Sequence, residues 1–214
     1  MFKPASATLL AATLLAGCSS RGELATEGGV GITAVRSACP AVGVPAGTGD
    51  VTLFDPPASQ EARAIDVVAT LTNVRATCDE AGGDITSRIS FDVQARRTRT
   101  DAARVVQLPY FVTVVRGGTQ VVSKRIGQVA LRFEAGSARA SAAGQGSAIV
   151  DRAAATLPAE VRTQITRRRR AGDQDAAVDP LSDPKVRAAV LNASFEALVG
   201  FQLTDAQLRY NVTR

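Results

Sequence analysis

The 214-residue sequence contains no histidine and no tryptophan, and aromatic residues make up only 4% of it. The lack of histidine excludes a Ser-His-Asp triad, removes the usual general base near neutral pH and leaves most zinc sites short of a ligand. Few aromatic side chains are available to stack on bases, which disfavours nucleic acid as a partner. A phosphate-binding loop is also missing, because Gly144-Gln145-Gly146 is followed by no lysine and no expected helix. These absences predict a non-catalytic protein without a cofactor or a bound metal.

The N-terminus carries the pattern of an export signal. Lys3 supplies a positive start, and an apolar run extends from Ala5 to Ala16. At about 12 residues, this run is too short to span a hydrocarbon core of ~30 Å but is typical of a signal peptide. We therefore expect residues 1–17 to be a signal peptide.

The stretch Leu15-Ala16-Gly17-Cys18 resembles the lipobox of bacterial lipoproteins. The resemblance implies cleavage before Cys18, acylation of that cysteine by diacylglycerol and a fatty acid such as palmitate, and contact with a membrane through this lipid anchor. Ser19 stands where an aspartate would imply retention at the inner membrane, so the resemblance implies the periplasmic face of the outer membrane. An ordinary secretory signal with an incidental cysteine is the alternative. The body is similar to bacterial lipoproteins of uncharacterised function, which implies no activity.

Assigning Cys18 to the lipid leaves Cys39 and Cys78 as the other two cysteines. Disulfides persist in the compartments that exported proteins reach, so we predict a bond between these two cysteines. It would close a loop of about 40 residues and stabilise the fold by roughly 4 kcal/mol. Two free buried thiols are the alternative. A metal site is not expected from two distant cysteines without a histidine.

The remaining sequence divides into a tether, a β domain and a helical region. Residues 18–37 are polar and glycine-bearing, which predicts a flexible tether. Residues 38–150 predict an antiparallel β domain, and residues 151–214 predict a helical region packed on it. Strands are expected over 51–54, 65–74, 85–96, 105–115 and 120–133. The small, polar stretch 136–150 is compatible with either a strand or a loop.

The pair of strands at 105–115 and 120–133 predicts a hairpin. Gly117-Gly118 between them favours a primed two-residue turn, because both glycines can take positive φ. The apolar parity of the second strand changes near Gly127, which predicts a β-bulge there. Pro109 cannot donate to a ladder, so its strand is expected to be an edge or to be interrupted at that point.

Two helices are expected in the C-terminal third. The first has an apolar stripe at period 3.6 over 157–165 and is expected to end with Arg167–Arg170. The second is expected over 185–199, with Asp183 as its N-cap. Thr204 and Gln207 have the spacing of a capping box for a final turn.

Consecutive hairpins followed by helices predict the α+β class. The expected form is an antiparallel β-sandwich of the immunoglobulin or fibronectin type followed by two C-terminal helices. The alternative is one curved antiparallel sheet with both helices packed on its buried face.

The most prominent charged feature is the cluster of Arg162, Arg167, Arg168, Arg169 and Arg170. It is a candidate surface for an anionic partner, such as a lipid phosphate, a glycan or an acidic protein. The alternative is a solvated helix end, where the macrodipole favours cations. The nearby acidic residues are predicted to serve turns and caps rather than a calcium loop: Asp173, Asp175, Asp179 and Asp183.

These features predict a non-catalytic outer-membrane lipoprotein, a periplasmic β module for binding an envelope protein or for envelope assembly. The first alternative is a protein that binds a small or amphipathic ligand between sheet and helices. An apolar cavity would favour that alternative, whereas a filled core and an exposed strand edge would favour the first hypothesis. A third hypothesis, an enzyme using carboxylates or a Ser/Lys pair, would need a cleft with converging polar groups.

Overall fold

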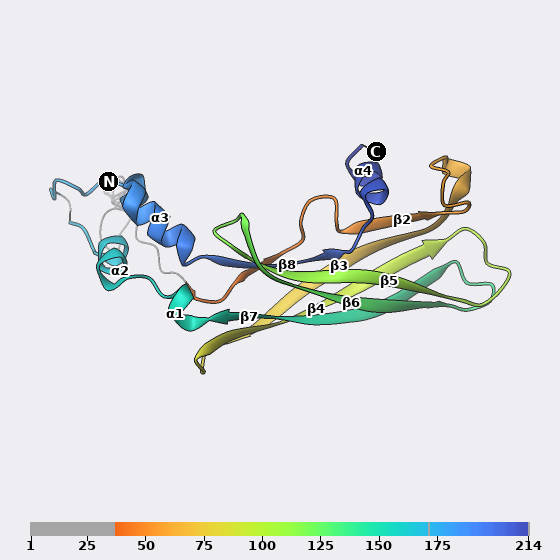
Figure 1. Cartoon of the computed structure of the whole chain (residues 1–214), viewed down its shortest axis with the longest axis horizontal. Coiled ribbons are helices and arrows are strands. Elements are labelled where there is room, and N and C mark those ends of the chain that lie inside the picture. Colours follow the sequence, from red (N-terminus) through yellow and green to blue (C-terminus); the bar gives the residue numbers. More distant parts are fainter. Residues whose placement is uncertain (1–36, 171, 214) are drawn as a thin grey trace, which may run out of the picture.

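The computed structural model describes residues 37–170 and 172–213, which form two facing four-stranded sheets (Figure 1). The first sheet has the order β1 (Ala41–Gly43), β8 (Phe195–Phe201), β5 (Arg104–Arg116), β6 (Gln120–Phe133). The second has the order β2 (Asp50–Phe54), β3 (Ile65–Asp79), β4 (Asp84–Arg97), β7 (Arg139–Asp151). Neighbouring strands are antiparallel except β1 and β8, which run parallel. The predicted α+β class is confirmed, and the alternative of a single curved sheet is wrong.

The helices are short and lie mostly after the strands. The described α-helices are α1 (Arg152–Ala155), α2 (Ala159–Thr166), α3 (Pro184–Asn192) and α4 (Asp205–Thr213), with 3-10 turns η1 (Ala62–Ala64) and η2 (Pro180–Ser182). The prediction of two C-terminal helices is therefore wrong in number. The region 151–214 is also not purely helical, because it contributes β8 to the first sheet.

The core between the sheets follows from strict alternation along β4. Its odd-numbered side chains are buried, while Arg88, Ser90 and Gln94 on the even-numbered positions are exposed, as in a strand with one buried face. The largest fully buried side chains of this core come from both sheets: Ile85, Ile89, Phe91, Leu131, Phe133 and Phe201. Each such side chain contributes about 1.5–3 kcal/mol through removal from water. The space between the sheets is filled by these side chains.

The β5–β6 hairpin has the predicted turn, but its bulge is elsewhere. Gly117 and Gly118 have φ of 61° and 77°, as a primed turn requires. The register shift lies between Val114 and Val115, which leaves Val122 of β6 as the extra residue. The predicted bulge at Gly127 is wrong. A Cβ there would lie 2.5 Å from the ring of Tyr110, so the glycine makes room for that ring.

Pro109 lies on a central strand, since β5 is flanked by β6 and β8. The β5–β8 ladder ends at Tyr110, and the Pro109 carbonyl accepts a 2.8 Å hydrogen bond from the Gln202 N–H just beyond β8. Strand β5 is continuous through Pro109, which pairs with Gln128 of β6, so neither the expected interruption nor the edge position is found.

The stretch left open by the sequence is the strand β7. Its small residues are explained by their neighbours, because a Cβ on Gly144 would overlap the Phe91 ring and one on Gly146 would lie 2.6 Å from Val112. Tyr110 Oη donates a 2.5 Å hydrogen bond to the Gln145 carbonyl. This bond joins β5 of the first sheet to β7 of the second.

The Cys39–Cys78 disulfide predicted from the sequence is present, with an S–S distance of 2.07 Å and a Cα–Cα distance of 6.1 Å. Cys39 lies just before β1, and Cys78 lies near the end of β3. The bond therefore ties the start of the first sheet to the second. The sequence separation of 39 between the cysteines closes a large loop in the unfolded chain.

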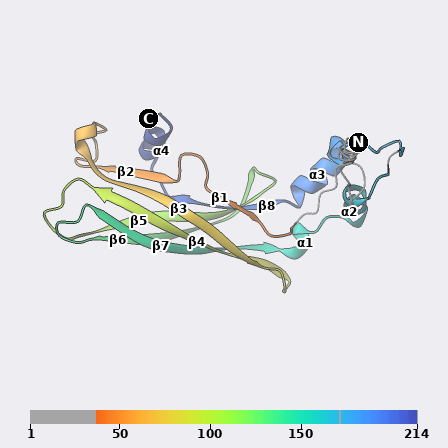
Figure 2. The same cartoon turned by 180° about the vertical axis from the view of Figure 1, so that it is seen from behind.

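The helices do not cover a sheet face as expected. In Figures 1 and 2, α1, α2 and α3 gather at one end of the sheets, while α4 lies beside β2. Apolar side chains of the α2–α3 region form a core cluster separate from the main one: Leu157, Val161, Ile165, Val186, Val190 and Ala193. The Tyr210 ring of α4 meets Phe54 of β2 edge-on, with centroids 5.1 Å apart. Across the described residues, no helix is long and apolar enough to cross a membrane.

Candidate functional site

The predicted arginine cluster is divided between a helix and the extended chain that follows it. Helix α2 ends at Thr166, and Arg167 begins extended chain with ψ of 124°. Arg162 is therefore on the helix, but Arg167, Arg168, Arg169 and Arg170 are not, and the prediction of a helix tip made of arginines is wrong.

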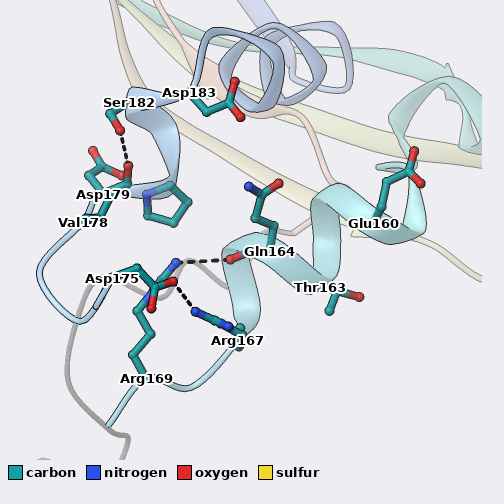
Figure 3. A pocket seen from close by; sticks show the side chains of 11 residues that line it. Glu160, Thr163, Gln164, Arg167, Arg169, Asp175, Val178, Asp179, Ser182 and Asp183 are labelled. Atoms are coloured by element: carbon teal, nitrogen blue, oxygen red, sulfur yellow. Dashed lines mark hydrogen bonds and ion pairs between the residues drawn. The ribbon is translucent and has the colours of Figure 1, made fainter. Parts of the chain in front are cut away.

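Two of these arginines are committed to a neighbouring loop (Figure 3). Arg167 forms an ion pair with Asp175, and Arg169 Nε lies 3.4 Å from the same carboxylate. The Arg169 side chain is only 4% exposed and its Nη2 donates to the Gln164 carbonyl at 3.4 Å. Arg167 and Arg169 thus hold the chain after α2 against the loop at 175.

The two arginines change the pKa of the Asp175 carboxyl. Burial alone would raise the pKa of the Asp175 carboxyl, but the charge of Arg167 and the hydrogen bond from Arg169 outweigh it, so this pKa is lowered. The stabilisation by the charged carboxylate is therefore present above its unfolded-state pKa. It is lost as the pH falls through the lowered folded-state pKa.

The depression beside these arginines is lined by more acidic than basic side chains. It has a volume of about 630 Å³ between α2 and η2, and four carboxylates line it against two arginines: Glu160, Asp175, Asp179 and Asp183. Asp179 and Asp183 accept hydrogen bonds from the Leu181 and Lys185 N–H groups, so their predicted turn and cap roles are confirmed. An anion is disfavoured in this depression. Arg162, Arg168 and Arg170 do not line it and are exposed.

The sequence reasoning missed the free edge of β6. This strand pairs with β5 on one side, and the first sheet has no strand beyond it. Every residue from 120 to 126 is exposed. Val121, Val122 and Ile126 are 62%, 54% and 63% exposed, so large apolar side chains accompany unpaired backbone groups. We name residues 120–126 the β6 edge.

The turn of the β5–β6 hairpin, next to the β6 edge, is bonded to the rest of the fold. The Gly117 N–H donates to the Ser194 carbonyl at 2.9 Å, and Arg116 Nε donates to the Asn192 carbonyl at 2.5 Å. These bonds anchor the hairpin tip to the α3–β8 junction. Lys124 Nζ lies 5.0 Å from the centre of the Phe111 ring, which fixes its charge on the outer face.

The β6 edge carries features that limit what can pair with it. A bulge at Val122 and the charges of Lys124 and Arg125 are devices by which proteins restrict edge pairing. Two copies of this edge would bring these like charges into the same short stretch, where they repel. A hetero-partner with acidic side chains meets no such repulsion.

The described residues contain one group of three or more potential metal ligands, formed by Cys39, Cys78 and Glu80. Both sulfur atoms are joined in the disulfide, so they do not offer thiolates to an ion.

Cys18, the proposed lipid attachment site, lies outside the described residues.

No protein-family model matches the chain. Comparisons with curated proteins and with solved structures give no significant match either. Function is therefore inferred from residue geometry and sequence pattern.

Proposed function

We propose that the protein is a non-catalytic lipoprotein on the periplasmic face of the outer membrane, and that it binds an envelope protein through the β6 edge. The single observation that carries the binding proposal is the exposed, one-sided strand edge with apolar side chains at Val121, Val122 and Ile126. An extended segment of a partner can add to such an edge through main-chain hydrogen bonds. Alternate side chains then give specificity.

The charges of the β6 edge define the partner further. Lys124 and Arg125 favour an extended segment that carries Asp or Glu among apolar residues. The anchored hairpin supports this mode, because an ordered edge loses little conformational entropy when a partner strand is added.

A ligand held between sheet and helices, the alternative function, has less support. Large side chains fill the space between the sheets, among them Phe91, Phe133 and Phe201. Helices α2 and α3 have a separate apolar cluster at the end of the sheets, rather than a shared cavity with a sheet face.

The sandwich is proposed to be of the immunoglobulin or fibronectin type in its general architecture. Two facing, mainly antiparallel sheets and a disulfide that ties the segment before β1 to β3 support this assignment. Domains of this architecture present strand edges and end loops on a rigid scaffold, which suits a binding role.

The lipid anchor is proposed from the lipobox at Leu15-Ala16-Gly17-Cys18. We expect the mature protein to begin at Cys18 with a diacylglyceryl adduct, because the stretch before it has the length of a signal peptide and not of a membrane span. Mass spectrometry of the N-terminal peptide measures this directly. A mature N-terminus at any other residue would contradict the anchor, and Cys18→Ser should leave the protein unprocessed or soluble.

The double substitution Val121→Asp with Ile126→Asp tests the β6 edge. We expect at least a tenfold loss of partner recovery in pull-downs from solubilised envelopes, because two new charges would face the acidic partner strand. The melting temperature should change little, since both side chains are exposed and make no core contact.

The matched control is Val178→Asp, which introduces the same charge at a valine that is 49% exposed in the loop before η2. It should leave partner recovery unchanged. Equal recovery with the β6-edge variant and the control would overturn the proposed binding mode.

A further inference from the structure

We propose that the outer face of the second sheet binds an acidic polysaccharide along a track of four arginines, which is a binding site separate from the β6 edge. The track consists of Arg75 on β3, Arg88 and Arg96 on β4, and Arg139 on β7. It lies on the sheet that does not contain β6, and Figure 2 shows this sheet on the nearer side.

The register places these arginines on one face. Arg88 is directly opposite Thr77 on β3 and Ser147 on β7, and directly paired residues project from the same face of a sheet. Arg75 is opposite Ser90, two positions along β4 from Arg88. The neighbouring odd-numbered side chains of β4 are buried, so this face is the outer one.

The four arginines have no ion-pair partner in the described part of the chain. Within the described residues, no ion pair involves Arg75, Arg88, Arg96 or Arg139. Two carboxylates of β4, Asp84 and Asp92, are each four positions from Arg88, and Asp92 accepts a 2.6 Å hydrogen bond from the Asn73 side-chain amide. All four arginines are exposed, so their guanidinium groups are available to an external anion.

The pairing of Arg96 with Arg139 is unfavourable in the isolated protein. These residues are directly opposite on β4 and β7. Like charges at such positions are close enough to destabilise a sheet. An anionic ligand that bridges the two guanidinium groups removes this repulsion.

The surroundings of the track suit a sugar chain. Around Arg75 and Arg88, a shallow depression of about 520 Å³ is lined by hydroxyl and amide side chains, including Thr77, Ser90, Gln145 and Ser147. These groups can both donate and accept hydrogen bonds, as sugar hydroxyls require. Farther along β7, the outer positions 141 and 143 hold the small residues Ser and Ala, which leave a low path toward Arg139.

The length of the track identifies a polymer rather than a small anion. Arg88 and Arg96 are eight positions apart on one strand, which corresponds to about 26 Å at ~3.3 Å per residue. A ligand with regularly repeated carboxylates can contact both ends, and each carboxylate can form a two-bond contact with a guanidinium group. The described positions of the track carry no aromatic side chain for base stacking, so nucleic acid is disfavoured.

Isothermal titration calorimetry with an oligogalacturonide tests the proposal. The protein is the full chain with Cys18→Ser, which keeps every other residue and removes the lipid attachment site. We expect binding that weakens as salt is raised, because the exposed charges are screened over ~10 Å at 0.1 M. The fully methyl-esterified oligosaccharide, which has the same sugars without the charge, should not bind.

The variant Arg75→Gln with Arg88→Gln should weaken this binding by about tenfold or more while leaving the melting temperature unchanged. Arg132→Gln, at an exposed arginine of β6, is the matched control and should bind normally. Absence of binding, equal binding of the methyl ester, or retained affinity in the double variant would overturn the proposal. Binding only to vesicles containing phosphatidylglycerol would also overturn it, by assigning the track to a lipid surface.

Discussion

Removal of the disulfide by Cys39→Ala with Cys78→Ala is expected to lower the free energy of unfolding by about 4 kcal/mol. The 39-residue separation gives the unfolded chain a large loop to release once the bond is absent. The native state also depends on this bond, because β1 has three residues and, among the described strands, pairs with β8 alone. Thermal unfolding should show a fall in melting temperature of roughly 8–16 °C.

The disulfide prediction has an internal control. The wild-type protein in a reducing agent should unfold at the same temperature as the double alanine variant, because both lack the same constraint. Equal melting temperatures for the oxidised wild type and the variant would contradict a stabilising role. A variant that is less stable than the reduced wild type would instead point to lost packing of the Cys39 side chain against the core.

Arg97→Met is expected to destabilise the fold by about 3 kcal/mol, although the substitution keeps the length of the side chain. Arg97 is 6% exposed and ends β4. Its guanidinium donates to the carbonyls of Ser137, Ala102 and Glu134 at 2.8, 2.6 and 2.8 Å. These acceptors lie in two of the connections by which the chain passes between the sheets, from β4 to β5 and from β6 to β7.

The methionine would leave these carbonyls without their donor and would place no charge over the Phe133 ring, whose centroid lies 5.1 Å from the guanidinium carbon. Melting curves should show a fall of roughly 6–12 °C. The adjacent Arg96→Met is the matched control, because Arg96 is exposed and makes no described hydrogen bond through its side chain. Similar effects of the two substitutions would contradict the role assigned to Arg97.

The strands with one buried face were predictable from the sequence because their side chains alternate between a buried apolar position and an exposed polar position. Along β4 the alternation of apolar and polar residues fixes both the strand and its buried face. Gly117 and Gly118 fix the hairpin, because their positive φ angles suit glycine and few other residues. Thr204 and Gln207 form the expected reciprocal cap, with the Thr204 N–H bonded to the Gln207 side chain and the Gln207 N–H to the Thr204 hydroxyl.

Strand β8 was missed because its residues satisfy two periods at once. Val190, Ala193 and Ala197 continue a helical stripe, yet Phe195, Ala197, Val199 and Phe201 alternate as in a strand. Tertiary contacts favour the strand over the helix, because these residues pair between β1 and β5 and are buried there. No local pattern in the sequence indicates that the first sheet needs a strand between β1 and β5.

The arginine cluster was misread for a related reason. Four consecutive arginines predict a solvated helix end, but Arg169 is buried by its contacts with Asp175 and the Gln164 carbonyl. Its acidic partner lies six residues ahead, in a stretch whose conformation the sequence does not define. The β6 edge was predictable in part, because Val122 and Ile126 break the parity set by Val129 and Leu131.

The most direct test of the central claim is site-specific photocrosslinking in intact cells. A photoreactive amino acid in place of Val121 should give one dominant adduct with an envelope protein, and Ile126→Asp in the same chain should abolish it. The same photoreactive group in place of Val178 should not give this adduct. An identical adduct pattern from positions 121 and 178, or an adduct from position 121 that persists with Ile126→Asp, would contradict binding through the β6 edge.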